Sequence, residues 1–146
     1  MRMTNAELLD FQKHTHKKLR AKPKHDEDDL QSQCIEFARF QYPSKLIFMI
    51  PNAMSFGGAG PAERGRFFGK LAKLKKMGLM KGVSDLFISE ASRGYHGLYL
   101  EAKTKIGKQS PEQNLFEKAV KFRGYDYHEF RTFEDFQSIL AWYLAP

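Results

Sequence analysis

The sequence predicts a single α/β domain in which helices pack on a β-sheet. Three observations support this class. Short apolar runs typical of strands alternate with longer segments whose apolar residues recur at helical spacing. Their order is helix, strand, helix, strand, strand, helix, strand, helix, which favours a layered α/β fold. The length of 146 residues suits one domain, and the composition, 42% hydrophobic and 28% charged, is that of a globular protein.

The N-terminal segment, residues 1–24, is predicted to be a basic arm with a helix over residues 5–20. It holds seven Lys or Arg residues against Glu7 and Asp10. Pro23 breaks the helical pattern, and residues 25–146 then form the domain. A solvated tail and an arm that contacts DNA both remain open.

The first helix of the domain is predicted in the segment HDEDDLQSQCIEFARFQYP. Leu30, Cys34 and Phe37 recur at helical spacing, so Cys34 is expected to pack in the core. Glu27 and Gln31 are four residues apart and share a face of this helix. Cys34 is the lone cysteine, which excludes a disulfide within the chain and a cysteine-based zinc site, and favours a reducing, cytoplasmic location.

A buried strand is predicted at residues 45–52, KLIFMIPN, followed by a glycine-rich loop and a helix over residues 62–77. Residues 64–84 contain seven Lys or Arg and no acid, and the formal net charge of the chain is +7. A stretch with positive charges alone favours contact with phosphate backbones. The alternative is a helix face that is basic but contacts only solvent. The predicted DNA-binding residues are Arg64, Arg66, Lys70, Lys73 and Lys76, with Lys81 and Lys105 beyond the helix.

Two strands are predicted next, at residues 82–89 and 97–105. A helix follows in SPEQNLFEKAVKFRG, where Ser110 is a suitable N-cap and Gln113 completes a capping box. Its expected apolar face consists of Leu115, Phe116, Ala119 and Val120. A strand in YDYHEF and a helix in TFEDFQSILAWYL complete the domain, with Phe136, Ile139, Leu140 and Tyr143 expected to face inward.

The strand at residues 97–105 carries chemistry that an apolar core does not need. Alternate residues of a strand share a face, so Glu101 and Lys103 project together with Tyr99. If the two strands pair, Asp85 lies beside Glu101. Two converging carboxylates require a cation, and oxygen ligands without cysteine favour Mg²⁺ or Mn²⁺. An ion pair across a hairpin is the structural alternative.

This constellation resembles that of a known superfamily. Asp85 followed by Glu101-x-Lys103, in a strand-strand-helix setting, resembles the PD-(D/E)xK nucleases. The ordered set of Glu27 with Gln31, then IPN, GVSDLF, LYLEAKT and SPEQ resembles the VRR-NUC family, in its stand-alone phage type, over residues 27–143. The resemblance implies a restriction-endonuclease-like fold, a mixed central sheet flanked by helices.

The resemblance also implies roles for individual residues. Asp85 and Glu101 correspond to metal ligands, together with the backbone carbonyl of Ala102. Lys103 corresponds to the residue that orients or activates the attacking water. Glu27 corresponds to an acid that completes the site, through water or a second metal.

Other positions correspond less directly. Gln31 and Gln113 resemble glutamines of the family that lie near the site. Ser84 departs from the pattern, because the family usually has proline before the aspartate. Proline would stiffen the approach to Asp85 but supplies no ligand.

The function implied is a metal-dependent DNA endonuclease, selective for branched DNA such as Holliday junctions and acting as a homodimer in the cytoplasm (of the host, if phage-encoded). Cleavage of flaps, nicks or duplex ends remains an alternative, as does a non-catalytic DNA-binding module. No apolar run of about 18 residues is present, so no membrane span is expected.

Overall fold

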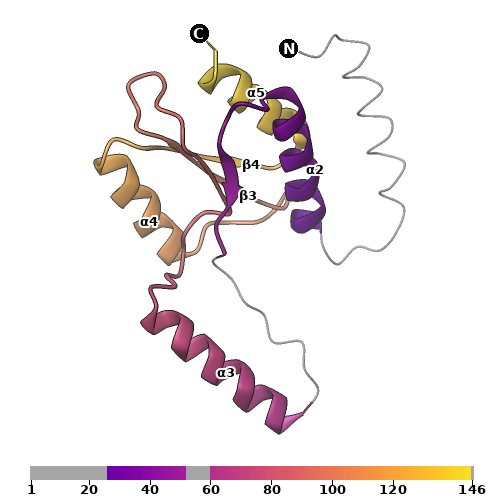
Figure 1. The fold of residues 1–146 in the computed structure, drawn as a ribbon, viewed down its shortest axis with the longest axis vertical. Helices are drawn as coiled ribbons and strands as arrows, with labels where there is room; N and C mark the ends of the chain where they lie inside the picture. Colours follow the sequence, from indigo (N-terminus) through magenta and orange to yellow (C-terminus); the bar gives the residue numbers. More distant parts are fainter. Residues whose placement is uncertain (1–25, 52–59, 146) are drawn as a thin grey trace.

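The computed structural model describes residues 26–51 and 60–145. The predicted basic arm, its helix, and most of the glycine-rich loop lie outside these residues. Figure 1 shows a sheet with helices on both faces and one helix set apart from it.

The observed order of elements is the predicted one. The sheet has the strand order β1-β2-β3-β4, with β1–β2 and β2–β3 antiparallel and β3–β4 parallel. The prediction of a mixed α/β sheet flanked by helices is therefore confirmed. The elements are α2 (Asp26–Gln41), β1 (Ile47–Met49), α3 (Pro61–Lys76), β2 (Leu86–Ile88), β3 (Leu98–Ala102), α4 (Pro111–Phe122), β4 (Asp126–Phe130) and α5 (Phe133–Tyr143).

The main core lies between the sheet and the helices α2 and α5. Leu98, Leu100 and Ala102 point from β3 into this core, where they meet Cys34 of α2 and Phe136 of α5. All five side chains are buried, as predicted for Cys34 and Phe136. Burial at this scale is the main stabilising contribution to the fold. The other residues of β3 therefore face the opposite side, which α4 covers (Figure 1).

The side of the sheet under α4 is aromatic in its middle and polar at one end. Tyr99 of β3 packs edge-on against Phe116 of α4, with ring centroids 5.2 Å apart. Val120 is buried on the same helix. Leu115 was predicted to share this apolar face, but it is 67% exposed. The prediction is wrong because α4 covers the sheet with a narrow stripe, and Leu115 lies outside it.

The strand β1 is shorter and more exposed than predicted. Ile47 is buried, whereas Phe48 and Met49 are exposed. The buried strand predicted over residues 45–52 is therefore wrong in length and burial. The physical reason is that β1 forms the edge of the sheet, so only its Ile47 side meets the core.

Helix α3 has no buried residue and stands away from the sheet (Figure 1). Its partly exposed residues include Phe67, Leu71 and Leu74, which recur at helical spacing and form an apolar stripe. Within residues 26–51 and 60–145, no helix is long and apolar enough to cross a membrane.

Candidate active site

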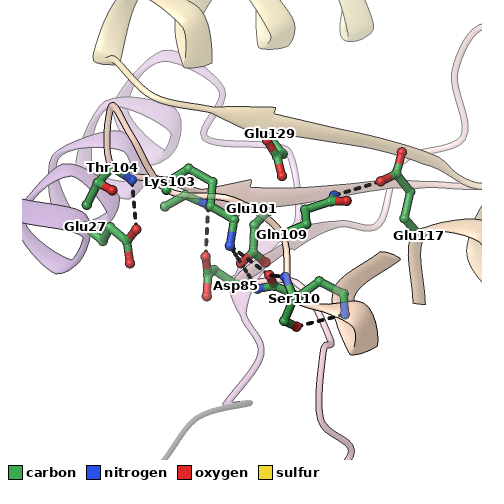
Figure 2. Close-up of polar contacts among 12 residues, drawn as sticks. Glu27, Asp85, Glu101, Lys103, Thr104, Gln109, Ser110, Glu117 and Glu129 are labelled. Carbon is green, nitrogen blue, oxygen red and sulfur yellow. Dashed lines mark hydrogen bonds and ion pairs between the residues drawn. The ribbon is translucent and has the colours of Figure 1, made fainter. Parts of the chain in front are cut away.

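The polar end of β3 places one carboxylate beside one amine. Glu101 is 3% exposed and Lys103 is 7% exposed. The Nζ atom of Lys103 lies 2.8 Å from Oε1 of Glu101. The prediction that these two side chains project together is confirmed (Figure 2).

Asp85 reaches the same place from the neighbouring strand. The register pairs Leu86 with Leu100, so Asp85, immediately before β2, meets the end of β3. The backbone N–H of Ala102 donates to Oδ2 of Asp85 at 2.9 Å. In an extended strand the N–H and C=O of one residue point the same way, so the Ala102 carbonyl also faces the Asp85 side.

Ser84 ties the turn that presents Asp85. Its side chain is fully buried, and its hydroxyl donates to the carbonyl of Leu86 at 3.2 Å. This hydrogen bond joins the two residues that flank Asp85 in the chain. It therefore restrains the turn at Ser84, the position where the family that the sequence resembles usually has proline.

Gln113 connects the site to the start of α4. Its side-chain oxygen accepts hydrogen bonds from Lys103 Nζ at 2.9 Å and from the backbone N–H of Ser110 at 2.9 Å. Its side-chain nitrogen donates to Oε1 of Glu101. The Ser110 hydroxyl in turn accepts from the Gln113 backbone, which completes the capping box predicted from the sequence. Gln113 therefore restrains both Lys103 and Glu101.

The carboxyl of Glu101 is buried with one oxygen that has no partner among the described residues. Burial, the nearby Asp85 carboxylate and the Glu129 carboxylate raise the pKa of Glu101 to about 7, although Lys103 opposes the shift. Its second oxygen, Oε2, is buried and has no hydrogen-bond partner among the described residues. A buried carboxylate oxygen without a partner is costly, and a cation between Asp85 and Glu101 would remove that cost.

Glu27 joins the site from α2. Its Oε1 atom accepts a hydrogen bond from the backbone N–H of Thr104 at 2.8 Å. The contact fixes the residue that follows Lys103 (Figure 2). Gln31, one helical turn later, is half-buried and does not line the cavity described next.

These side chains open into a cavity of about 480 Å³, which α3 closes on one side. Leu71 and Lys75 of α3 contribute to the wall, as does Lys81 from the loop that follows. Lys75 was missed as a candidate, whereas its neighbour Lys76 was predicted. The lining residues are Glu27, Leu71, Lys75, Leu79, Lys81, Gly82, Val83, Asp85, Glu101, Lys103, Ser110, Glu112 and Gln113.

The remaining predicted DNA-binding residues lie outside the cavity. Arg64, Arg66, Lys70, Lys73 and Lys76 are all exposed along α3, and Lys105 is exposed on the turn after Lys103. The exposed residues of α3 thus provide a basic surface that continues from the wall of the cavity.

The donor set fits a hard divalent cation that keeps open positions. Within residues 26–51 and 60–145, no group of three or more His, Cys, Asp or Glu side chains could enclose a metal. The site instead offers Asp85, Glu101 and the Ala102 carbonyl. Mg²⁺ is commonly held by one or two carboxylates, with water and substrate phosphates as its other ligands.

Gly82 sets the distance between the Asp85 turn and α4, and its replacement gives a test of this arrangement. Its φ is +80°, and a Cβ there would lie 2.4 Å from the carbonyl carbon of Glu112. Gly82→Ala is expected to lower the free energy of unfolding by about 2 to 5 kcal/mol, because strain and a backbone clash add. Chemical denaturation measures the loss.

The matched control is Gly94, whose φ is +85° and which has nothing within 4 Å of a Cβ. Gly94→Ala is expected to cost only the strain, about 1 to 2 kcal/mol. Equal losses in the two variants would contradict the close approach of Gly82 to α4.

Comparison with solved structures finds the same fold in a protein described as a "VRR_NUC domain protein". The TM-score is 0.60 and the sequence identity is 21%, over 84% of this chain and 91% of the other. No protein-family model and no curated protein matches the sequence. At this identity the likeness establishes the shared fold, and the chemistry must be argued from the site itself.

Proposed function

We propose that this chain is a VRR-NUC nuclease of the PD-(D/E)xK type that hydrolyses DNA phosphodiester bonds with Mg²⁺ or Mn²⁺. One observation carries the proposal: Asp85, Glu101 and Lys103 converge in one cavity, beside a helix whose exposed face is basic. The likeness of fold to a VRR_NUC domain protein supports it.

In the proposed reaction, Asp85, Glu101 and the Ala102 carbonyl would hold the metal. A bound divalent ion supplies polarisation of the scissile phosphate and lowers the pKa of a water molecule. Lys103 remains within hydrogen-bonding reach of the same space, where its ammonium aligns the water and stabilises developing negative charge. Gln113 and Glu101 hold that ammonium in place.

The basic residues then act on the rest of the DNA. Lys75 and Lys81 line the cavity and would contact phosphates next to the scissile bond. The exposed basic residues of α3 would bind the backbone further along. Phosphate contacts of this kind position the duplex without reading its sequence.

The basic surface of α3 can be tested through its salt dependence. In the double variant Lys70→Ala/Lys73→Ala, we expect KM to rise while kcat is nearly unchanged. The slope of log affinity against log salt should shrink by about 2, since each lost phosphate contact accounts for about 0.9. The double variant Lys118→Ala/Lys121→Ala, at exposed positions of α4, is the control. An equal effect in both would contradict a specific role of α3.

We further propose selectivity for branched DNA by a homodimer, because two symmetric active sites would suit two symmetric cuts. Exposed apolar side chains on and after α3 support an association surface, namely Phe68, Met77 and Met80. Light scattering coupled to size-exclusion chromatography measures the molar mass. A monomer at all working concentrations would contradict the homodimer.

The substrate is tested with a panel of labelled DNAs: a four-way junction, a flap, a nicked duplex, a plain duplex and a single strand. Each is incubated with Mg²⁺, Mn²⁺ or EDTA. Metal-dependent cutting of the junction at symmetric positions is the expected result. Cutting of flaps, nicks or duplex ends instead would support the proposed nuclease activity but contradict selectivity for four-way junctions. Binding without cutting in either metal would indicate a non-catalytic module.

A further inference from the structure

The turn that follows Lys103 has little apolar packing to hold it. Lys105 is exposed, and Ile106 is 90% exposed. The Gly107 N–H donates to the Thr104 carbonyl at 3.1 Å, which closes the turn upon itself. A turn without core contacts needs other restraints, since ordering each residue costs conformational entropy.

Arg131, the residue after β4, supplies such a restraint. Its Nη1 atom donates to the carbonyl of Thr104 at 2.5 Å and to the carbonyl of Gly107 at 2.9 Å. One guanidinium nitrogen thus bridges both ends of the turn. With Glu27 on the N–H of Thr104, both backbone groups of the residue after Lys103 are fixed by side chains.

The position of Arg131 explains how it reaches the turn. The last backbone hydrogen bond between β3 and β4 runs from the Lys103 N–H to the Phe130 carbonyl, at 3.0 Å. Arg131 is the residue that immediately follows β4. Its side chain therefore continues the connection between the two strands beyond the point where their backbones stop pairing.

Glu129 holds the other arm of the guanidinium. Its Oε2 atom lies 3.0 Å from Nη2 of Arg131. Glu129 is also the register partner of Glu101 on the neighbouring strand, and Figure 2 shows it on β4 above the site. The planar guanidinium fork can serve two carbonyls and a carboxylate together, whereas a lysine ammonium lacks this fixed geometry.

We infer that Arg131 is a positioning residue of the active site, which fixes the backbone around Lys103 by clamping the turn of residues 104–107. The inference deepens the proposed nuclease function and rests on it. Arg131 does not line the cavity, so its effect passes through the turn and not through contact with substrate.

Cleavage kinetics test the inference first. In Arg131→Gln, kcat is expected to fall by about 10- to 100-fold, the usual range for a residue that orients a catalytic group, while KM is nearly unchanged. Arg131→Lys restores part of kcat, because an ammonium can still reach one carbonyl. Arg123→Ala is the control, since Arg123 also donates to a backbone carbonyl (Ala119, at 2.7 Å) but lies at the far end of α4.

Hydrogen exchange tests it without reference to activity. The amide of Gly107 is expected to exchange at least about 10-fold faster in Arg131→Gln than in the wild type, because the carbonyls that define the turn are released. Arg123→Ala leaves this amide unchanged. Thermal melting of each variant verifies that the fold is retained.

Two results would overturn the inference. One is an unchanged exchange rate of Gly107 in Arg131→Gln. The other is a rise in KM with kcat retained and a salt slope smaller by about 1, which would make Arg131 a phosphate contact. If the wild type cuts no DNA, the proposed function fails, and the exchange measurement alone decides whether Arg131 holds the turn.

Discussion

Replacing Lys103 with methionine is expected to slow DNA cleavage by about 10³-fold, with little change in DNA affinity. Methionine keeps much of the length and apolar body of the side chain but removes the ammonium. The space that the ammonium shares with Glu101 and Gln113 would then lack its positive charge. Single-turnover rates at saturating DNA and metal measure the loss.

Lys121→Ala is the matched control for Lys103→Met. Lys121 also pairs with a glutamate, Glu117, at 2.6 Å, but it is an exposed pair on α4. Its loss is expected to leave the rate unchanged, because exposed ion pairs contribute little. A fall in rate of the same size in both variants, or in neither, would contradict a catalytic role of Lys103.

Glu101→Gln is expected to abolish cleavage and to weaken Mg²⁺ binding by more than about 100-fold, since one of the two proposed carboxylate ligands is lost. In the wild type, Mg²⁺ affinity is expected to decrease as the pH falls below the Glu101 pKa of about 7, because a proton then competes with the metal. Isothermal titration calorimetry over this pH range measures both effects. A wild-type affinity independent of pH would contradict the assignment of Glu101 as a ligand.

In the absence of metal, the Glu101 carboxyl should make the free energy of unfolding depend on pH. Its pKa rises from 4.5 in the unfolded reference to about 7 in the folded protein. The folded state therefore keeps a proton that the unfolded chain has lost, and the contribution of Glu101 to stability is greatest below pH 4.5 and declines as the pH rises through 7.

Chemical denaturation in EDTA, at about pH 5 and about pH 8, tests this sign. Relative to Glu101→Gln, the wild type is expected to lose a few kcal/mol of unfolding free energy between the two values. No change relative to the variant would show that Lys103 compensates the carboxylate fully, and a gain in stability as the pH rises would contradict a raised pKa of Glu101.

The helices, the strands and the central residues of the site could be predicted because the sequence patterns that mark them involve residues close together in the chain. Ser110 and Gln113 mark the start of α4 through a capping box, which depends on residues three apart. The alternation of β3 places Glu101 and Lys103 on the side opposite Leu100, because side chains of a strand alternate. The pairing of two adjacent strands then brings Asp85 to them.

Other features depend on contacts between distant segments, which no local pattern encodes. Lys75 lines the cavity and Lys76 does not, because the end of α3 meets the site through one side only. The exposure of Leu115 reflects how narrowly α4 covers the sheet. The clamp of Arg131 on the turn after Lys103 joins residues 27 positions apart, and a lone arginine after a strand carries no signal of it.

Cleavage of one labelled DNA by the wild type, Lys103→Met and Glu101→Gln, each with Mg²⁺ or with EDTA, tests the central claim most directly. The proposed site predicts that all three proteins bind the DNA, that the wild type cuts it at least about 10³-fold faster than either variant, and that EDTA abolishes the cutting. Cleavage retained in both variants would place the chemistry elsewhere, and binding without any cleavage by the wild type would show that the fold has no nuclease activity on that DNA.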